Sequence, residues 1–209
     1  PTSVGGGVGS VGQQDGIFGV LTNSSSSVRT AVYTVVPTTN PSCPSNSFTL
    51  TVTINPRPLI NAMTTVTCSG QPFVVSPTDV VNGRVPVNNT YSWGEPTYSA
   101  SITGGLSDSG KSTIFGTLNN TSSVTQTATY VVTPTSQFGC VGAAFTLTVR
   151  LDPGGFVNPM STANCSGVMF NVTPTNGTNG IIPPGTKYTW TVPSYTGTVS
   201  GGVSMSVGM

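Results

Sequence analysis

Charged residues are scarce in this chain. Only 5% of its 209 residues are Asp, Glu, Lys or Arg, whereas a typical soluble protein has about 25%. The formal net charge is +1, which excludes the basic face expected of a nucleic-acid-binding protein or a partner of anionic membranes. No apolar run approaches the roughly 20 residues that a membrane-spanning helix needs. We therefore expect no nucleic-acid partner and no membrane span in this segment.

Histidine is absent altogether. Its absence excludes a Ser-His-Asp arrangement and would leave a cysteine nucleophile without its usual imidazole base. The four cysteines form no C-x-x-C motif, so a zinc site is not indicated either. The five acidic residues are scattered through predicted turns, without the carboxylate pairing that acid–base catalysis uses. The sequence predicts no catalytic residue and no enzyme activity.

Threonine, serine, valine, glycine and proline dominate instead. Thr and Val are β-branched and favour pleated strands, and the 26 glycines and 17 prolines mark frequent turns. No long segment has apolar residues at helical spacing. This composition predicts an all-β protein whose surface carries hydroxyls and amides rather than charges.

The chain repeats itself with an offset of 97 residues. When residues 1–112 are aligned without a gap to residues 98–209, 43 of the 112 pairs are identical. The identities include cysteines, tryptophans and tyrosines, which indicates a repeated domain rather than the shorter repeat of a solenoid. The matched aromatic and cysteine pairs are Tyr33 with Tyr130, Cys43 with Cys140, Cys68 with Cys165, Tyr91 with Tyr188, and Trp93 with Trp190.

Two proline- and glycine-rich segments, 53–62 and 150–159, interrupt the strand pattern at equivalent places. Such residues favour an extended connector without strands, so we place the boundaries near residues 57 and 154. The predicted organisation is the C-terminal part of one repeat (1–57), a complete repeat (58–154) and the N-terminal part of the next (155–209). Because the chain begins inside the repeat pattern, we expect it to be a piece of a longer protein.

Alternating apolar residues within the complete repeat predict strands with one buried face. The segments concerned are 73–78, 90–93, 127–135 and 144–151, and the last two form a predicted hairpin around a glycine-containing loop. About seven short strands with a tryptophan on an early one are typical of an immunoglobulin-like β-sandwich. The predicted core residues are Phe73, Val75, Tyr91, Trp93, Tyr130, Val132, Phe145, Leu147 and Val149.

Four cysteines without metal-binding partners favour disulfides, and hence an oxidising compartment outside the cytosol. One candidate pairing joins Cys68 to Cys140 within the complete repeat, which would close a loop of about 70 residues and stabilise the fold by roughly 4 kcal/mol. The rival pairing crosses the boundaries, joining Cys43 to Cys68 and Cys140 to Cys165. The number of strands between the cysteines decides which pair meets, and the sequence leaves it open.

The phrases "TYVVTPTSQFGC" and "AAFTLTVRLDP", followed by "CSG" and Y-x-W, resemble the PKD-like repeats of very large cell-surface adhesins of Bacteroidetes. The resemblance extends over the whole chain and rests on structural positions, including Cys68, Trp93, Tyr130, Pro134 and Cys140. It implies tandem β-sandwiches, type IX secretion and an extracellular, outer-membrane-attached location on the cell surface. It also implies a role in surface attachment and gliding motility, and carries over no catalytic residue.

A few residues remain as candidate ligand contacts. Asp152, near a connector, offers an oxygen ligand for Ca²⁺ but lacks further carboxylates, so we expect no cofactor and keep structural Ca²⁺ as the weaker alternative. Trp93 and Trp190 fit a sandwich core better than a carbohydrate platform. Tyr98 and Tyr195 are the weak candidates for glycan contacts.

The leading functional hypothesis is a structural and adhesive repeat segment of a secreted cell-surface adhesin. Its partners would be neighbouring repeats of the same chain, with a surface polysaccharide or substratum as a further partner. Parallel terminal strands, sheared along the direction of pull, would make each repeat resist load. The alternatives are a glycan-binding β-sandwich module and an accessory domain of a secreted hydrolase.

Overall fold

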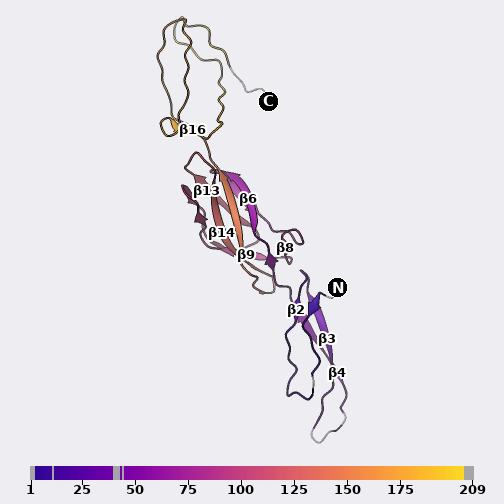
Figure 1. The fold of residues 1–209 in the computed structure, drawn as a ribbon. Coiled ribbons are helices and arrows are strands. Elements are labelled where there is room, and N and C mark those ends of the chain that lie inside the picture. The colour runs from indigo at the N-terminus through magenta and orange to yellow at the C-terminus, as the bar shows by residue number, and fades with distance from the viewer. Residues whose placement is uncertain (1–2, 11, 40–42, 44, 205–209) are drawn as a thin grey trace.

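A computed structural model describes residues 3–10, 12–39, 43 and 45–204. The chain is elongated, with an N-terminal part (up to residue 57), a middle unit (58–154) and a C-terminal part (from residue 155) arranged in a row (Figure 1). The regular elements of the described residues are all β-strands. No helix among these residues has the length and hydrophobicity to cross a membrane.

The middle unit contains eleven short strands, more than the seven or so expected, because turns and bends divide the chain more finely than the alternation suggests. Its strands are β5 (Leu59–Ile60), β6 (Met63–Cys68), β7 (Pro72–Val75), β8 (Gly83–Arg84), β9 (Thr90–Trp93), β10 (Thr97–Tyr98), β11 (Ile102–Gly104), β12 (Asp108–Lys111), β13 (Ile114–Asn120), β14 (Gln126–Thr135) and β15 (Phe145–Asp152).

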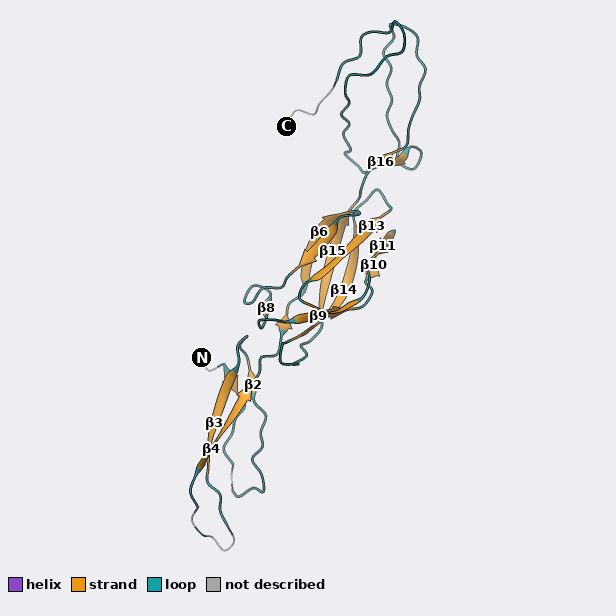
Figure 2. Cartoon of the chain, turned by 180° about the vertical axis from the view of Figure 1, so that it is seen from behind, coloured by secondary structure: helices purple, strands orange, loops and turns teal. Residues whose placement is uncertain are grey.

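Two sheets face each other in the middle unit (Figure 2). One has the order β12-β9-β14-β15-β6, with β10 also pairing with β14, and the other has the order β11-β13-β7. The predicted hairpin corresponds to β14 and β15, which pair antiparallel from Gln126 with Leu151 to Val132 with Phe145. This arrangement confirms the predicted all-β, immunoglobulin-like sandwich.

The first long strand and the last strand of the middle unit lie side by side. β6 pairs with β15 in parallel, with six register pairs running from Met63 opposite Leu147 to Cys68 opposite Asp152. The chain therefore enters the sheet at one end of this ladder and leaves it at the other.

The core lies between the two sheets and contains the inward-facing residues of each strand. Phe73 packs against Tyr130 with ring centroids 5.8 Å apart, and Trp93 meets Phe115 edge to face at 5.7 Å. The Trp93 indole N–H donates a hydrogen bond to the carbonyl of Leu106 (3.1 Å), so its polar atom is satisfied. All nine predicted core residues are buried, together with Ile60, Val85, Ile102, Ile114, Leu118, Ala128 and Leu151.

The flanking parts contain fewer strands. In the N-terminal part β3 and β4 form a two-stranded antiparallel sheet and β1 pairs with β2. In the C-terminal part β16 pairs with β17. The bounds of these strands are β1 (Val4–Gly5), β2 (Thr22–Asn23), β3 (Arg29–Val35), β4 (Phe48–Ile54), β16 (Phe156–Val157) and β17 (Gly180–Ile181).

The prediction of a strand-free connector is wrong. β4 continues to Ile54, and β5 begins at Leu59, where it pairs with β8. Pro56 and Pro58 are fully buried between these strands. The connector is therefore packed into the fold, with the rings of both prolines removed from solvent.

Candidate functional site at the repeat junctions

The contacts between successive units form the best-defined candidate site. At the first junction, the end of the N-terminal part where β2 lies meets the end of the middle unit where β8 lies (Figures 1 and 2). The Ser26 hydroxyl donates a hydrogen bond to the Asp79 carboxylate across this junction, with an O–O distance of 2.6 Å. Ser26 and Asp79 thus link two units directly.

Asp79 is held in place by its own unit. Its second carboxylate oxygen accepts a hydrogen bond from the backbone N–H of Val85 (2.8 Å), which fixes the loop between β7 and β8. The Ser26 hydroxyl, followed by the Val85 N–H, lowers the pKa of the Asp79 carboxyl below its ordinary value. Both donors favour the ionised form, so Asp79 accepts two charge-assisted hydrogen bonds at neutral pH.

The second junction reproduces this contact 97 residues later. Asn176 occupies the position of Asp79, and its side-chain amide donates to the Ser123 hydroxyl at 2.9 Å. The Asn176 carbonyl accepts from the backbone N–H of Ile182 (2.9 Å), as Asp79 does from Val85. The geometry is the same at the two junctions while the direction of the inter-unit hydrogen bond is reversed, because an amide nitrogen replaces a carboxylate oxygen.

The loop behind each contact is also reproduced. The backbone N–H of Thr78 donates to the Asn82 side chain at 2.8 Å, and Thr175 donates to Asn179 at the same distance. Asn82 and Asn179 are each followed by a glycine that pairs with the connector strand. Both junctions are therefore built on the same short hairpin-like pair, β5–β8 in one and β16–β17 in the other.

Gly83 and Gly180 are required by this geometry. Their φ angles are 113° and 133°, values that L-residues with side chains rarely adopt. A Cβ atom at Gly83 would lie 2.3 Å from the carbonyl oxygen of Leu59, and one at Gly180 would lie 2.3 Å from that of Phe156. Only glycine allows the two backbones to approach this closely.

On the other side of each junction, a buried asparagine holds the loop that presents the serine. The Asn120 side chain is only 3% exposed. Its amide donates to the carbonyls of Val124 (2.8 Å) and Leu151 (3.1 Å), and its carbonyl accepts from the N–H and hydroxyl of Ser122 (2.9 and 2.7 Å). Asn120 thereby fixes the loop that carries Ser123.

Asn23 has the equivalent role in the N-terminal part. Its amide donates to the carbonyls of Ser27 (2.8 Å) and Ile54 (2.9 Å), and its carbonyl accepts from the N–H and hydroxyl of Ser25. The same hydrogen bonds therefore position Ser26 at the first junction and Ser123 at the second.

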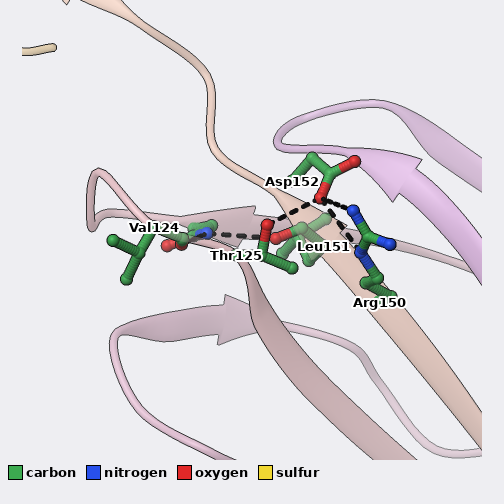
Figure 3. A network of polar contacts seen from close by, with 6 residues as sticks. Val124, Thr125, Arg150, Leu151 and Asp152 are labelled. Atoms are coloured by element: carbon green, nitrogen blue, oxygen red, sulfur yellow. Dashed lines mark hydrogen bonds and ion pairs between the residues drawn. The ribbon is translucent and has the colours of Figure 1, made fainter. Parts of the chain in front are cut away.

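The carboxylate of Asp152 adds a network at the second junction (Figure 3). One carboxylate oxygen accepts from the Thr125 hydroxyl (2.8 Å) and from the Arg150 guanidinium (3.1 Å). The Thr125 hydroxyl, followed by Arg150, lowers the pKa of Asp152. These partners engage one oxygen of the Asp152 carboxylate, and no group of three or more Cys, Asp or Glu side chains gathers among the described residues.

Two arginines distinguish the first junction from the second. The Arg57 guanidinium donates to the carbonyl of Val141 (2.6 Å) and the Arg84 guanidinium to the carbonyl of Arg57 (2.7 Å). Their counterparts at the second junction are Gly154 and Ile181. These hydrogen bonds tie the connector of the first junction to β8 and to the turn between β14 and β15.

The predicted disulfides are not formed: all four cysteines are free. In the middle unit, Cys68 lies beside Asp152 at the last register pair of β6 and β15, whereas Cys140 lies in the turn before Phe145, where β15 begins. The eight residues of β15 separate the two cysteines by roughly 20 Å or more, while a disulfide requires Cα atoms within about 7 Å. The Cys68–Cys140 prediction is therefore wrong in this structure.

The rival pairing fails for the same reason. Cys43 follows β3 at the end of its hairpin remote from the middle unit, and Cys68 lies at the far end of that unit. Cys140 and Cys165 are separated by one repeat in the same way, since they are the counterparts of Cys43 and Cys68. Cys68 and Cys140 thus lie at opposite ends of one sandwich, and the cysteines of each rival pair lie at opposite ends of two successive units. The free cysteines therefore give no support to the predicted oxidising compartment.

The tyrosines proposed for glycan contact lie away from the junction contacts. Tyr98 is on β10, 41% exposed, and its hydroxyl donates to the carbonyl of Gly104. The Tyr195 hydroxyl accepts from the backbone N–H of Gly202 (2.6 Å). Neither lines the shallow depression of about 540 Å³ on the middle unit, which is formed by Ser92, Trp93, Gly94, Ser107, Asp108, Ser109, Val131 and Thr133.

The residues of the junction, including Ser26, Asn23 and Asp79, were not among the sequence-predicted site residues. They lie in Ser-, Thr- and Asn-rich loops that are typical of solvent-exposed turns. The signal that could have found them is the repeat: Asn23, Ser26 and the Asn82-Gly83 pair recur unchanged 97 residues later, although loops between strands have no packing reason to be identical.

Comparison with known proteins supports a family assignment. No curated protein matches the chain. The family of PKD-like domains matches residues 2–58 and 64–155, which include the strands of the N-terminal part and all but the first strand of the middle unit. This match spans well over half of the chain, and with the sandwich of β6–β15 and its repeated junctions it establishes that the chain belongs to the PKD-like domain family.

Proposed function

We propose that this chain is a structural and adhesive segment of a large secreted cell-surface adhesin. The observation that carries the proposal is the recurrence of one junction: the Ser26–Asp79 contact and its supporting hydrogen bonds reappear at Ser123 and Asn176. PKD-like domains typically occur in extracellular proteins. A recurring junction gives successive units a common orientation, as an extended stalk requires.

The finer assignment follows the resemblance of the repeat phrases to gliding-motility adhesins such as SprB of Bacteroidetes. On this proposal the segment is secreted by a type IX system, attached to the outer membrane and engaged with a substratum during gliding. It needs no cofactor and carries out no chemical step, since it has no histidine and its Asp152 carboxylate is engaged by Thr125 and Arg150. Weak contacts repeated along the array would add up by avidity.

The parallel pairing of β6 and β15 supports a load-bearing role. When the chain is pulled from its two ends, force acts along this ladder in opposite directions and loads its six register pairs together. Pulling the same two strands apart from one end would instead break the pairs one after another. The direction of pull should therefore decide the force at which the middle unit unfolds.

Single-molecule force spectroscopy on the full chain tests this role. In one experiment the chain is pulled through its termini. In the other it is pulled through Cys68 and an introduced Gly154→Cys, with Cys43, Cys140 and Cys165 changed to serine. We expect a severalfold higher unfolding force for terminal pulling. Equal forces in the two directions, or terminal unfolding at a force close to thermal noise, would refute the load-bearing proposal.

A second candidate function is glycan binding at the depression beside β9 and β12. It is rimmed by the Ser92, Ser107 and Ser109 hydroxyls and the Asp108 carboxylate, groups that pair with sugar hydroxyls, and its size is within the range of small-ligand sites. Titration of the chain with bacterial and algal polysaccharides, with Asp108→Ala as the comparison, decides it. Binding that is lost in the variant supports a glycan module, whereas no binding leaves the stalk role alone.

A further inference from the structure

Two neighbouring arginines at the first junction have no acidic partner. The chain contains only six Lys and Arg residues, and two of them meet here, because the Arg84 guanidinium donates to the backbone carbonyl of Arg57 (2.7 Å). Among the described residues, the cations that form ion pairs with a carboxylate are Lys111 and Arg150. Arg57 and Arg84 therefore place two positive charges at the end of the middle unit where β8 lies (Figure 1), and no carboxylate of the described chain pairs with them.

Each guanidinium is held in place through one nitrogen. The Nε–H of Arg57 donates to the carbonyl of Val141, and the Nε–H of Arg84 donates to the carbonyl of Arg57. A guanidinium has five N–H donors, so the terminal Nη donors of both side chains remain available, without a protein partner among the described residues. Such donors form a fork that matches two oxygens of a carboxylate or sulfate group. Because the Nε contacts already order the side chains, binding an anion costs less side-chain entropy.

The turn that accepts the Arg57 hydrogen bond adds amide and aromatic groups. This turn joins β14 to β15 and is closed by a hydrogen bond from the Ser136 N–H to the Cys140 carbonyl (3.0 Å). The Asn88 side chain donates to that of Gln137 in the same turn at 3.1 Å, and Phe138 beside it is 43% exposed. Side-chain amides pair with sugar hydroxyls, and an exposed phenyl ring offers an apolar face to a sugar ring.

The second junction shows that the arginines are not needed to build the connector. The counterparts of Arg57 and Arg84 are Gly154 and Ile181. Without any arginine, β16 pairs with β17 in the register that β5 and β8 have at the first junction. The connector therefore forms in either sequence, and its two arginines have no structural role that the second junction shares. This difference favours a ligand as the reason for the pair of cations.

We propose that Arg57 and Arg84 form a binding site for an acidic polysaccharide, with its carboxylate or sulfate groups paired to the two guanidinium groups. Nucleic acids are bound through many phosphate contacts, for which two cations are few, whereas the amides and the phenyl ring nearby suit a sugar. The site is separate from the depression beside β9 and β12. It names a class of surface for the proposed adhesive role and is independent of the load-bearing role.

Isothermal titration calorimetry of the full chain with acidic polymers tests the site. Dextran sulfate supplies sulfate groups, polygalacturonate supplies carboxylates, and uncharged dextran is the reference. We expect binding to at least one acidic polymer and none to dextran. The affinity should fall severalfold between about 50 and about 200 mM salt, because salt screens the attraction between exposed charges. The acidic polymer that binds more tightly identifies the preferred anionic group.

Substitutions copied from the repeat itself locate the binding. Arg57→Gly with Arg84→Ile reproduces the second junction and should weaken the affinity by about tenfold or more, since both charged donors are lost. Arg150→Thr with Lys187→Thr is the matched control: it removes the same charge elsewhere, copies the residues one repeat earlier, and should leave the affinity nearly unchanged. Arg57→Lys with Arg84→Lys keeps the charges without the fork and should weaken the affinity by about threefold. Circular dichroism checks that each variant is folded.

Several outcomes would overturn the proposal. Binding to neither acidic polymer would do so, as would an affinity that Arg57→Gly with Arg84→Ile leaves unchanged. An equal loss in the matched control would assign the binding to net charge rather than to this site. Tighter binding of double-stranded DNA than of either polysaccharide, lost in the same variant, would make the ligand a nucleic acid. None of these outcomes affects the unfolding force, so the load-bearing role is tested separately.

Discussion

The middle unit and the two flanking parts have nearly the same core residues and differ in whether those residues are covered. Twelve core positions of the middle unit, among them Tyr130 and Leu147, recur unchanged in one flanking part or the other. They are buried where both halves of the sandwich are present and are partly or well exposed elsewhere. Alternation thus defines the inward face of a strand, but burial depends on the strands that face it.

The junction loops, unlike the core residues, have the same surroundings in the flanking parts as in the middle unit. Their hydrogen bonds recur almost without change at Asn23 and Asn120, and at Gly83 and Gly180, although the flanking units differ in how much of a core they have. The junction loops are held by contacts with residues close in sequence and with the neighbouring strand end. The junction loops can therefore form without a complete sandwich, whereas burial of the core residues requires both sheets.

The largest difference in the effect of one substitution on stability is expected between Leu147 and its counterpart Leu50. Leu147 is fully buried, so Leu147→Ala should lower the free energy of unfolding of the middle unit by about 2–5 kcal/mol. Leu50→Ala should change it by less than about 0.5 kcal/mol, the range of substitutions outside the core. Urea unfolding followed by Trp93 fluorescence in a Trp190→Phe background measures both, and equal losses would mean that the two parts share one core.

A second difference is expected at the buried asparagines. Asn120→Ala removes a side chain that satisfies two carbonyls and the Ser122 donors, so the middle unit should lose about 1–3 kcal/mol. Asn23→Ala removes the same bonds from the N-terminal part and should leave the unfolding of the middle unit unchanged. Thermal unfolding of the two variants checks this. A comparable loss in both would show that the junction transmits stability from one unit to the next.

Much of the fold could be predicted from the sequence, because strand alternation is a local signal. Phe145, Leu147 and Val149 alternate with polar residues and lie on the buried face of β15, as the pattern predicts. The pairing of β5 with β8 could not be predicted this way, since each contributes only two residues. Short pairs of this kind are set by tertiary contacts rather than by periodicity.

The junction site was less accessible to sequence reasoning. Ser26 and Asp79 are 53 residues apart and belong to different units, so no local motif links them. The cysteines misled the prediction because equal spacing in sequence says nothing about the end of the sandwich at which each one lies. The only sequence signal for the junction was that several of its loop residues, such as Asn23 and Ser26, are identical 97 residues later.

The two junction glycines should respond differently to one substitution. Gly83→Ala forces a side chain into a backbone conformation that costs roughly 1–2 kcal/mol and against the Leu59 carbonyl, so the middle unit should lose at least that much stability. Gly180→Ala strains only the C-terminal part. Chemical denaturation of both variants, with Gly185→Ala as a control for a positive-φ glycine with no close neighbour, distinguishes the contributions. An unaffected Gly83 variant would mean that β5–β8 opens without consequence.

The smallest expected effect is the response of the two junctions to acid. Hydrogen bonds from Ser26 and then Val85 lower the pKa of Asp79, so its folded form binds a proton less readily than its unfolded form. The stabilisation is complete above pH 3.8, the ordinary value, and is lost as pH falls through the lower pKa of the folded state. Since the site is largely open to solvent, the effect should be below about 1 kcal/mol.

Energy transfer between dyes on native cysteines can follow each junction separately. Cys43 with Cys140 spans the first junction and Cys68 with Cys165 the second, each pair one repeat apart. Between pH 7 and pH 2.5 the first pair should show a broader distance distribution, and Asp79→Asn, which copies Asn176, should remove that change. The second junction should respond less, through Asp152 and its Thr125 partner, and Asp152→Asn, which copies Asn55, should remove what remains. An identical acid response in the wild-type chain and in Asp79→Asn would contradict this prediction. Asparagine does not titrate, so the response would then come from a group other than Asp79.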